Sequence, residues 1–302
     1  MNRLLLCMLV LCTLSLVGTA RADSDGANDP SDADPTSGPD GDIPDDLDEV
    51  SRQLDNPLTS LWSLTFENKA FIKEGDATGD REVANQTFFQ PGLPVPLGKN
   101  DEMVLIARPV FPLVTNPSLD AASSDGTDGH TTGFGDIQML SLVGPNRLDG
   151  IVWGLGTTMR FPTNSDDDLG TDKWQLGPSA MLFKMGRPWV FGALVQSWWS
   201  IAGEGSAKST AQTDIQYVIR YALPDAWSVG VGPTVSIDWK QGNDDKLTLP
   251  IGLGLTKTIR IGKMPIKLRG EVQYSVVRPD SYGTEWTFLF RIAPVIRSPF
   301  AD

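Results

Sequence analysis

The single histidine of the chain lies in a stretch whose residue types could support hydrolysis of a lipid. His130 follows the serines Ser123 and Ser124 in a segment rich in glycine and aspartate. A histidine that activates a serine is the basis of nucleophilic hydrolysis, but the pair needs a rigid platform and an acid that orients the imidazole. The composition of this loop favours a solvated histidine, so we expect no enzymatic activity and no cofactor.

A run of aspartates is the second group with a chemistry of its own. Asp166, Asp168 and Asp172 supply carboxylate oxygens, which are the ligands that Ca²⁺ prefers. The alternative is a solvated acidic loop without metal. Both cysteines lie in the first twelve residues, and the sequence elsewhere offers one histidine, so no zinc site of the usual ligand set is expected. The sequence also lacks a phosphate-binding glycine loop and a basic, aromatic-interleaved patch for nucleic acid.

The element that positions the remaining charges is the segment 226–240, which reads AWSVGVGPTVSIDWK. Apolar residues take every second place from Trp227 to Trp239, and small or polar residues take the places between them. A period of two indicates a β-strand with one apolar and one polar face. A tryptophan at each end of the apolar stripe is typical of a strand that crosses a membrane, where indole rings gather at both interfaces.

The same pattern recurs along the chain and predicts about 12 strands. Long and short connections alternate between them, which favours an up-and-down barrel. The predicted fold is therefore all-β, a closed antiparallel up-and-down transmembrane β-barrel over 57–302, with Trp227, Trp239 and Trp286 at the membrane interfaces. The predicted strands are 58–72, 87–97, 102–114, 133–143, 150–162, 174–185, 188–202, 211–223, 226–240, 246–261, 265–278 and 284–297.

The polar faces of these strands carry charges at regular places, which suit a wet lumen. In a pore, arginines on this face would bias selectivity toward anions. The alternative is an internal network of paired charges that fills the barrel and blocks flow. Both faces of the first strands are apolar, which predicts a lumen that is dry or plugged in part. The lumen-facing candidates are Arg108, Asp136, Arg160, Asp214, Arg220, Asp238, Lys267, Arg269, Glu271, Arg291 and Arg297.

The N-terminus has the features of a secretory signal. Residues 1–22 combine the early charge of Arg3, an apolar run and a small-residue end at Ala22, which predicts cleavage after Ala22. Cys7 and Cys12 would leave with the signal. The mature chain is therefore expected to contain no disulfide.

Much of the formal net charge of −13 falls within 23–56, where Arg52 is the only basic residue. So acidic a composition, with few apolar residues, predicts a disordered periplasmic segment. Near its end Leu47, Val50 and Leu54 share one face of a short predicted helix, and the aspartates before it are placed to cap its start.

Several stretches resemble a bacterial group of outer-membrane proteins, the family of the meta-pathway of phenol degradation, also labelled neuromedin U-like or transporter. The resemblance covers about 56–300 and rests on NPLTSLWSLTFEN, GFGDIQMLSLV, GLGTTMRFPTNSDDDLGTDKWQLGPSAM, PWVFGALVQSWWSIAG and IGKMPIKLRGEVQY. It implies a barrel in the bacterial outer membrane and, by association, the passage of small apolar or aromatic compounds.

The sequence thus predicts passive uptake or efflux of small, apolar or aromatic solutes through an outer-membrane barrel. Its partners would be outer-membrane lipid and a small-molecule solute, with no nucleic acid. A structural or adhesion-type barrel with cation-binding acidic loops is the first alternative. An outer-membrane lipid hydrolase that uses His130 is the second.

Overall fold

The computed structural model describes residues 43–76, 81–98, 101–117, 129–203, 205 and 207–296. The predicted signal and the acidic stretch up to residue 42 lie outside the described residues, as do Ser123, Ser124 and Arg297.

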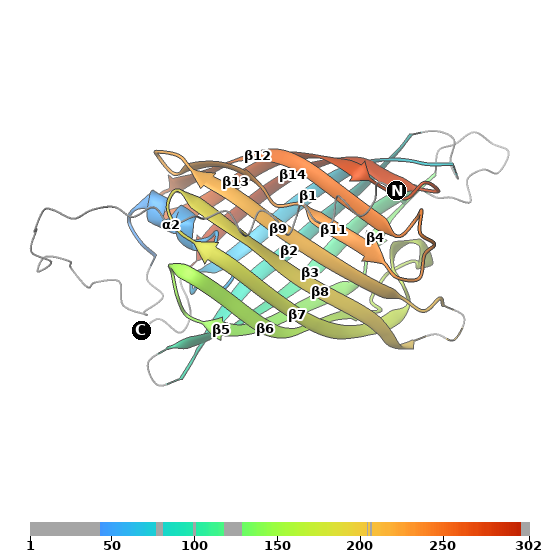
Figure 1. Ribbon diagram of the computed structural model, residues 1–302, viewed down its shortest axis with the longest axis horizontal. Helices are drawn as coiled ribbons and strands as arrows, with labels where there is room; N and C mark the ends of the chain where they lie inside the picture. Colours follow the sequence, from blue (N-terminus) through green and yellow to red (C-terminus); the bar gives the residue numbers. More distant parts are fainter. Residues whose placement is uncertain are drawn as a thin grey trace, which may run out of the picture. The chain divides into compact units, whose positions relative to one another are not determined.

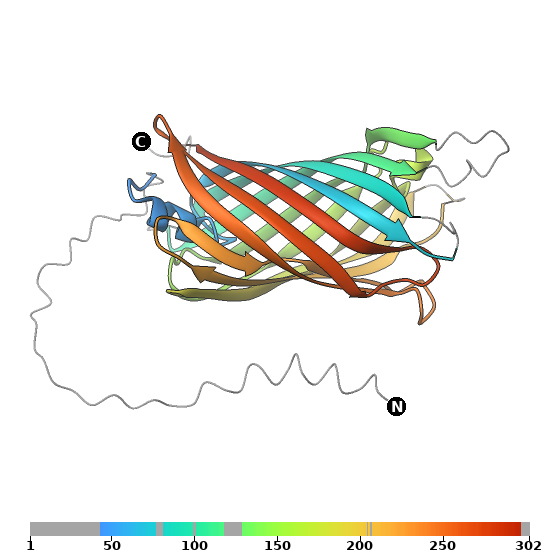
Figure 2. The ribbon, with the colours of Figure 1, turned by 90° about the horizontal axis from the view of Figure 1, so that it is seen from above.

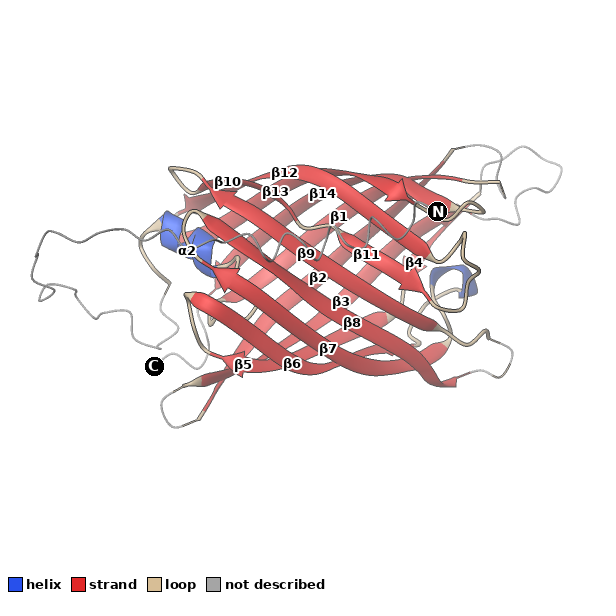
Figure 3. Ribbon diagram, in the orientation of Figure 1, coloured by secondary structure: helices blue, strands red, loops and turns tan. Residues whose placement is uncertain are grey.

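Antiparallel strands make up most of the described chain (Figures 1 and 2). Figure 3 shows helix only near the two ends of the barrel: α2 (Leu47–Gln53) at one end and the single-turn η2 (Asp167–Leu169) at the other. Neither is long and apolar enough to span a bilayer, and the same holds for every helix in the described residues. The strands are β1 (Trp62–Glu74), β2 (Glu82–Leu97), β3 (Met103–Pro117), β4 (His130–Phe134), β5 (Ile137–Pro145), β6 (Gly150–Phe161), β7 (Lys173–Met185), β8 (Trp189–Gly203), β9 (Ala211–Ala222), β10 (Trp227–Val231), β11 (Thr234–Asp238), β12 (Leu247–Ile261), β13 (Met264–Val277) and β14 (Gly283–Ile296).

The sheet closes on itself because β1 pairs with β14 as well as with β2. β4 and β5 both pair with β3, and β10 and β11 both lie between β9 and β12, so each of these two pairs is one interrupted strand. The 14-stranded sheet is therefore a twelve-stranded barrel. This confirms the predicted fold class.

The strand predicted over 226–240 is interrupted in the structure. Gly232 and Pro233 separate β10 from β11, and the carbonyl of Pro233 still accepts a hydrogen bond from the backbone N–H of Tyr217 at 3.2 Å. A proline has no N–H to donate to a neighbouring strand, so a ladder breaks or bulges where one falls. Pro250 likewise lies at a shift of register in β12.

The connections between strands define two rims. The short-turn rim also holds the start of β1 and the end of β14, and its turns are 98–102, 146–149, 186–188, 223–226 and 262–263. The long-loop rim lies at the opposite end, with connections 75–81, 118–129, 162–172, 204–210, 239–246 and 278–282.

The exterior of the barrel is apolar on most sides. Every strand except β5 and β11 exposes at least one large hydrophobic side chain, such as Leu253, Phe290 and Leu182. The opposite, inward face buries charged and polar groups, among them Glu271 and Thr258. This arrangement is the reverse of a soluble protein and leaves an apolar surface that only lipid can cover. The barrel is thus a transmembrane barrel.

The predicted interface tryptophans all lie on the exterior, close to a rim. Trp227 begins β10 at the short-turn rim, whereas Trp239 directly follows β11 and Trp286 lies near the start of β14, both toward the long-loop rim. The indole N–H of Trp239 donates to Oγ1 of Thr213 at 2.9 Å. Each indole can therefore lie at the boundary between lipid and water.

A charge on the lipid-facing surface is expected to destabilise the barrel according to its depth. Leu253, in the middle of β12, is 66% exposed, and Ile261, at the end of the same strand on the short-turn rim, is 60% exposed. Leu253→Arg should lower the free energy of unfolding by about 2–4 kcal/mol and Ile261→Arg by about 0–1 kcal/mol. Denaturant unfolding in lipid vesicles, followed by tryptophan fluorescence, measures both. Equal losses in the two variants would contradict a membrane whose midplane lies at the depth of Leu253.

Candidate functional site

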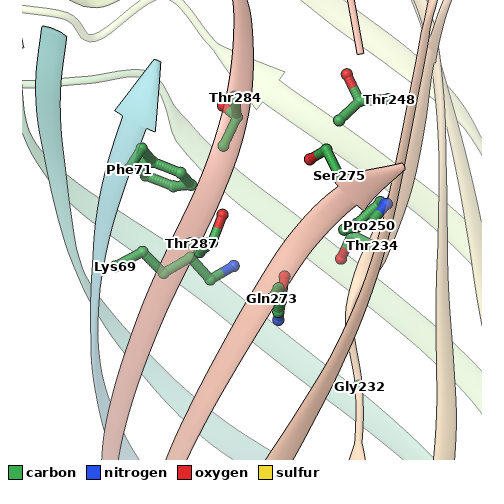
Figure 4. Close-up of a pocket in the computed structure, with 10 residues that line it drawn as sticks. All are labelled: Lys69, Phe71, Gly232, Thr234, Thr248, Pro250, Gln273, Ser275, Thr284 and Thr287. Atoms are coloured by element: carbon green, nitrogen blue, oxygen red, sulfur yellow. The ribbon is translucent and has the colours of Figure 1, made fainter. Parts of the chain in front are cut away.

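A cavity of about 810 Å³ lies inside the barrel. Inward side chains of β1, β2, β3, β5, β9 and β11 line it, and it reaches from residues 54–61 near the short-turn rim to residues 168–171 near the long-loop rim. A smaller cavity of about 110 Å³ adjoins the same wall. Figure 4 shows Lys69 and Phe71 of β1 at this smaller cavity, with Lys69 extending across β14 toward Gln273.

Residues 43–61, which precede β1, close the short-turn end of the barrel, and we call them the N-terminal plug. The predicted helix is present in it as α2, with Asp46 as N-cap. The sequence predicted disorder up to residue 56 and a first strand from residue 58. The structure instead packs 43–56 against the barrel and starts β1 at Trp62, because Leu58 and Leu61 are buried.

Apolar contacts hold one side of the plug. Leu58 is fully buried in a cluster of inward residues from β3 and β5–β8, and Gly144 makes room for it, since a Cβ there would lie 2.5 Å from Leu58 Cδ1. Val50 and Leu61 pack with Val295 of β14. The wall beside the plug is therefore dry. The cluster around Leu58 consists of Val104, Ile106, Leu140, Leu142, Val152, Met181, Phe183, Met185, Val190 and Leu194.

A buried ion triad holds the other side. Oδ1 of Asp55 lies 2.7 Å from Nζ of Lys267 and 3.1 Å from Nε of Arg220, and all three side chains are about nine-tenths buried. Burial alone would raise the pKa of Asp55, but the charges of Arg220 and Lys267 outweigh it and hold the pKa below its ordinary value of 3.8. Lys267 also donates to the carbonyl of Ser51 at 2.9 Å.

Further polar contacts tie α2 to the rim. Nη1 of Arg52 donates to the carbonyl of Leu148 at 2.6 Å and pairs with Asp149 at 2.5 Å. The hydrogen bond that Arg52 donates to Glu49 raises the pKa of Arg52 more than burial lowers it, so this guanidinium stays charged. The backbone N–H of Ala226 donates to Asp48 at 2.7 Å. The plug is thus bound to turns on several sides of the rim.

Asp136 holds the loop between β6 and β7 over the long-loop end of the cavity. Its carboxylate accepts hydrogen bonds from the N–H and Oγ1 of Thr171 at 2.9 and 2.8 Å, and from the N–H of Thr163 at 3.3 Å. Leu169 of η2, which is part of this loop, is 6% exposed and lines the cavity. Residues of the plug and of this loop therefore line the two ends of the cavity.

Four charged residues lie on the wall formed by β14, β1, β2 and β3, and we call them the Glu67 cluster: Glu67, Lys69, Arg108 and Arg291. Nε of Arg291 donates to the Glu67 carboxylate at 2.5 Å, and Nζ of Lys69 lies 3.2 Å from its other oxygen. The charges of Arg291 and Glu67 act on Arg108. Arg108 itself has no hydrogen bond or ion pair within the described part of the chain.

Arg160 lies on β6, which β5 separates from β3, and its guanidinium has partners, although its Nε makes no hydrogen bond in the described residues. Its guanidinium stacks on the ring of Trp198 at 4.0 Å, donates to Gln212 at 2.9 Å and lies 3.9 Å from Asp214. The cavity is thus lined by two arginines on nearby strands, of which Arg160 has partners and Arg108 has none in the described residues.

The remaining lumen candidates are placed as follows. Arg269 and Glu271 form a buried ion pair, and the Glu271 carboxylate also accepts from Gln273 at 2.7 Å. Asp238 shares the inward face of β11 but lies at the rim, where it accepts from the N–H of Lys240 at 2.9 Å. Most of the predicted charges are therefore paired with one another or with the plug, as in the network alternative, but a large cavity remains among them.

Two central carboxylates were absent from the predicted set. Asp55 belongs to the acidic N-terminal segment, where no strand pattern marks it as part of the barrel. Glu67 alternates with Phe66, which is 48% exposed, whereas Glu67 is 2% exposed. That alternation within 62–74 is the signal that could have identified Glu67.

The residues that the sequence suggested for hydrolysis and for calcium binding make contacts with nearby residues. Nε2 of His130 lies 3.3 Å from the carbonyl of Val83 on the long-loop rim. Asp166 accepts from the N–H of Asp168 at 3.1 Å, and Asp172 accepts from Asn164 at 2.9 Å. Within the described ranges, no group of three or more histidine, cysteine or acidic side chains is placed to hold a metal.

Comparison with known proteins gives a likeness of fold. No family model and no curated protein matches the chain, so its membership of the meta-pathway family stays a prediction. An outer membrane channel from Pseudomonas putida F1 superposes with a TM-score of 0.59 at 15% identity, over 78% of this chain and 94% of that one. The translocator domain of the autotransporter NalP from Neisseria meningitidis reaches 0.40 at 12% identity, over 78% and 88%. A Pseudomonas aeruginosa FadL homologue reaches 0.36 at 11% identity, over 85% and 96%.

The similarity to the Pseudomonas putida channel is a similarity of fold, and it agrees with the closed sheet and the apolar exterior of this barrel. The chain has the architecture of a barrel of the bacterial outer membrane.

Proposed function

We propose that this protein is an outer-membrane barrel for the passive passage of small, apolar or aromatic solutes, with the N-terminal plug on the periplasmic side. The observation that carries the proposal is the cavity of about 810 Å³ inside a barrel whose exterior suits lipid. Small-molecule sites in proteins enclose about 300–1,000 Å³. The cavity therefore has the volume for one small solute at a time.

The lining of the cavity supports this solute class. One wall carries inward apolar side chains of β3 and β5, namely Ile106, Val110 and Leu140, and β1 and β2 add Phe71 and Phe88. Polar and charged groups line the larger part of the cavity. A mixed surface of this kind favours a solute with an apolar or aromatic body over a fully hydrated sugar.

The plug is the main barrier in this proposal. Its contacts with the barrel are a few ion pairs and hydrogen bonds together with two apolar clusters, of which the one around Leu58 is the larger. Such contacts can break locally while the barrel stays closed, because the plug contributes no strand to the ladder. The rate of passage should therefore depend on how firmly the plug is held.

Swelling of proteoliposomes tests the proposal. Vesicles with the full chain are placed in an isosmotic solution of a small phenyl-substituted polyol, or of a sugar of similar mass, and light scattering records their swelling. The polyol should enter faster than the sugar, and faster than it enters protein-free vesicles. Equal rates for the polyol with and without protein would refute the proposal.

A further inference from the structure

The Glu67 cluster contains more positive than negative charge. Glu67 is shared by Arg291 and Lys69, which bind its two carboxylate oxygens. Arg108 is the third cation of the cluster and has no anionic partner in the described chain. A charge inside a barrel is costly unless a counter-charge accompanies it. The cluster therefore favours one additional anion in the cavity.

The surroundings of Arg108 indicate what kind of anion fits. Its neighbours two places away on the inward face of β3 are Ile106 and Val110, and its partner across the ladder on β5 is Leu140. The cation thus lies in an apolar wall of the cavity.

The surroundings of Arg160 differ from those of Arg108. Arg160 also lines the cavity, but a ring, an amide and a carboxylate surround its guanidinium. Arg108 offers the same planar donor group, which binds carboxylates through two parallel hydrogen bonds, with nothing in place to accept them. The asymmetry marks the β3 wall as the side on which an anionic solute binds.

We infer that the cavity binds a small monocarboxylate with an apolar or aromatic body, its carboxylate on Arg108 and its body against Ile106, Val110 and Leu140. The inference rests on the proposed function, because it names the class of solute that would pass. A benzoate-like molecule has both parts, whereas a neutral aromatic alcohol lacks the charge and chloride lacks the apolar body.

Calorimetric titration of the full chain in detergent tests the inference with benzoate, benzyl alcohol and chloride as probes. Benzoate should bind more tightly than either of the others. Arg108→Gln should weaken benzoate binding about tenfold or more, because it removes a charge-assisted pair, and should leave the weak binding of benzyl alcohol unchanged. Arg147→Gln removes the same charge from an exposed side chain in the turn 146–149 and should bind benzoate as the wild type does.

Val110→Glu is a second variant that keeps Arg108 and does not depend on the folding of Arg108→Gln. It puts a carboxylate beside the guanidinium, so it should exclude benzoate. Undiminished benzoate binding in either folded variant would overturn the inference, and so would equal affinity for chloride and benzoate. Either of these binding results would overturn the inference without deciding whether solutes pass through the barrel, which the swelling experiment measures. Conversely, vesicles that fail to swell in any solute would refute the proposed passage while the calorimetric result stands by itself.

Discussion

Asp55→Ala should release the N-terminal plug from the short-turn rim. The substitution leaves Arg220 and Lys267 buried beside each other without their carboxylate. Removing one partner of a buried ion group costs about 3–5 kcal/mol. The plug can avoid most of that cost by leaving the rim, because the two cations then meet water. The population with a detached plug should therefore rise about 100-fold.

Trypsin provides the measurement, since Arg52 in α2 becomes a cleavage site when the plug detaches. Cleavage after Arg52 should accelerate about 100-fold, and conductance in planar bilayers should rise with it. Asp149→Ala is the matched control: it also removes an ion-pair partner of the plug, but the Asp149 side chain is 74% exposed, so its loss should cost about 1 kcal/mol or less. Equal cleavage rates in the two variants would show that the buried triad does not hold the plug.

Low pH should release the N-terminal plug, as Asp55→Ala does. The pKa of Asp55 lies below its ordinary value, because Arg220 and Lys267 outweigh the effect of burial. A carboxyl group of this kind contributes stability that is fully present above the ordinary pKa of 3.8 and is lost as pH falls through the lowered pKa of the folded state. Trypsin is inactive there, so conductance is the readout. It should rise below about pH 4 in the wild type and stay high throughout in Asp55→Ala.

Glu67→Gln should have the second large effect, on both stability and selectivity. It leaves the cations of the Glu67 cluster without a counter-charge inside the barrel. The free energy of unfolding should fall by about 3–5 kcal/mol, measured by urea unfolding in lipid vesicles. The lumen also gains net positive charge, so the reversal potential in a KCl gradient should move toward chloride.

A double variant separates unpaired charge from loss of packing. Glu67→Gln combined with Arg291→Gln removes both members of the central pair and should recover part of the lost stability, because fewer buried charges remain unpaired. Glu102→Gln, on an exposed side chain of the turn 98–102, removes the same charge and should change stability by about 0.5 kcal/mol or less. If the double variant were less stable than Glu67→Gln, the effect could not be attributed to unpaired charge.

The strands were predictable because lipid outside and polar groups inside impose a period of two on nearly every segment. The twelve predicted strands and the alternation of turns and loops therefore correspond closely to the structure. The positions of the interruptions do not show in this periodicity, although the prolines at 233 and 250 mark them. The break at Gly232 and Pro233 leaves the alternation of side chains around it almost unchanged, so periodicity does not reveal it.

The plug could not be derived from the same signal. Its binding depends on contacts between segments far apart in sequence: Lys267 is 212 residues from Asp55, and Ala226 is 178 residues from Asp48. No local pattern encodes which rim residue a given aspartate meets. Composition alone described 43–56 as an acidic segment, although its few apolar residues are those that the barrel end buries.

The seat of the plug has a consequence for biogenesis. The plug is made first, yet Arg220, Lys267 and Val295, which receive it, belong to the last third of the chain. Its docking site is incomplete until β14 has met β1 and the circle of strands is closed. The N-terminus can therefore make all of its contacts only in the last step of assembly, after the final strand is in place.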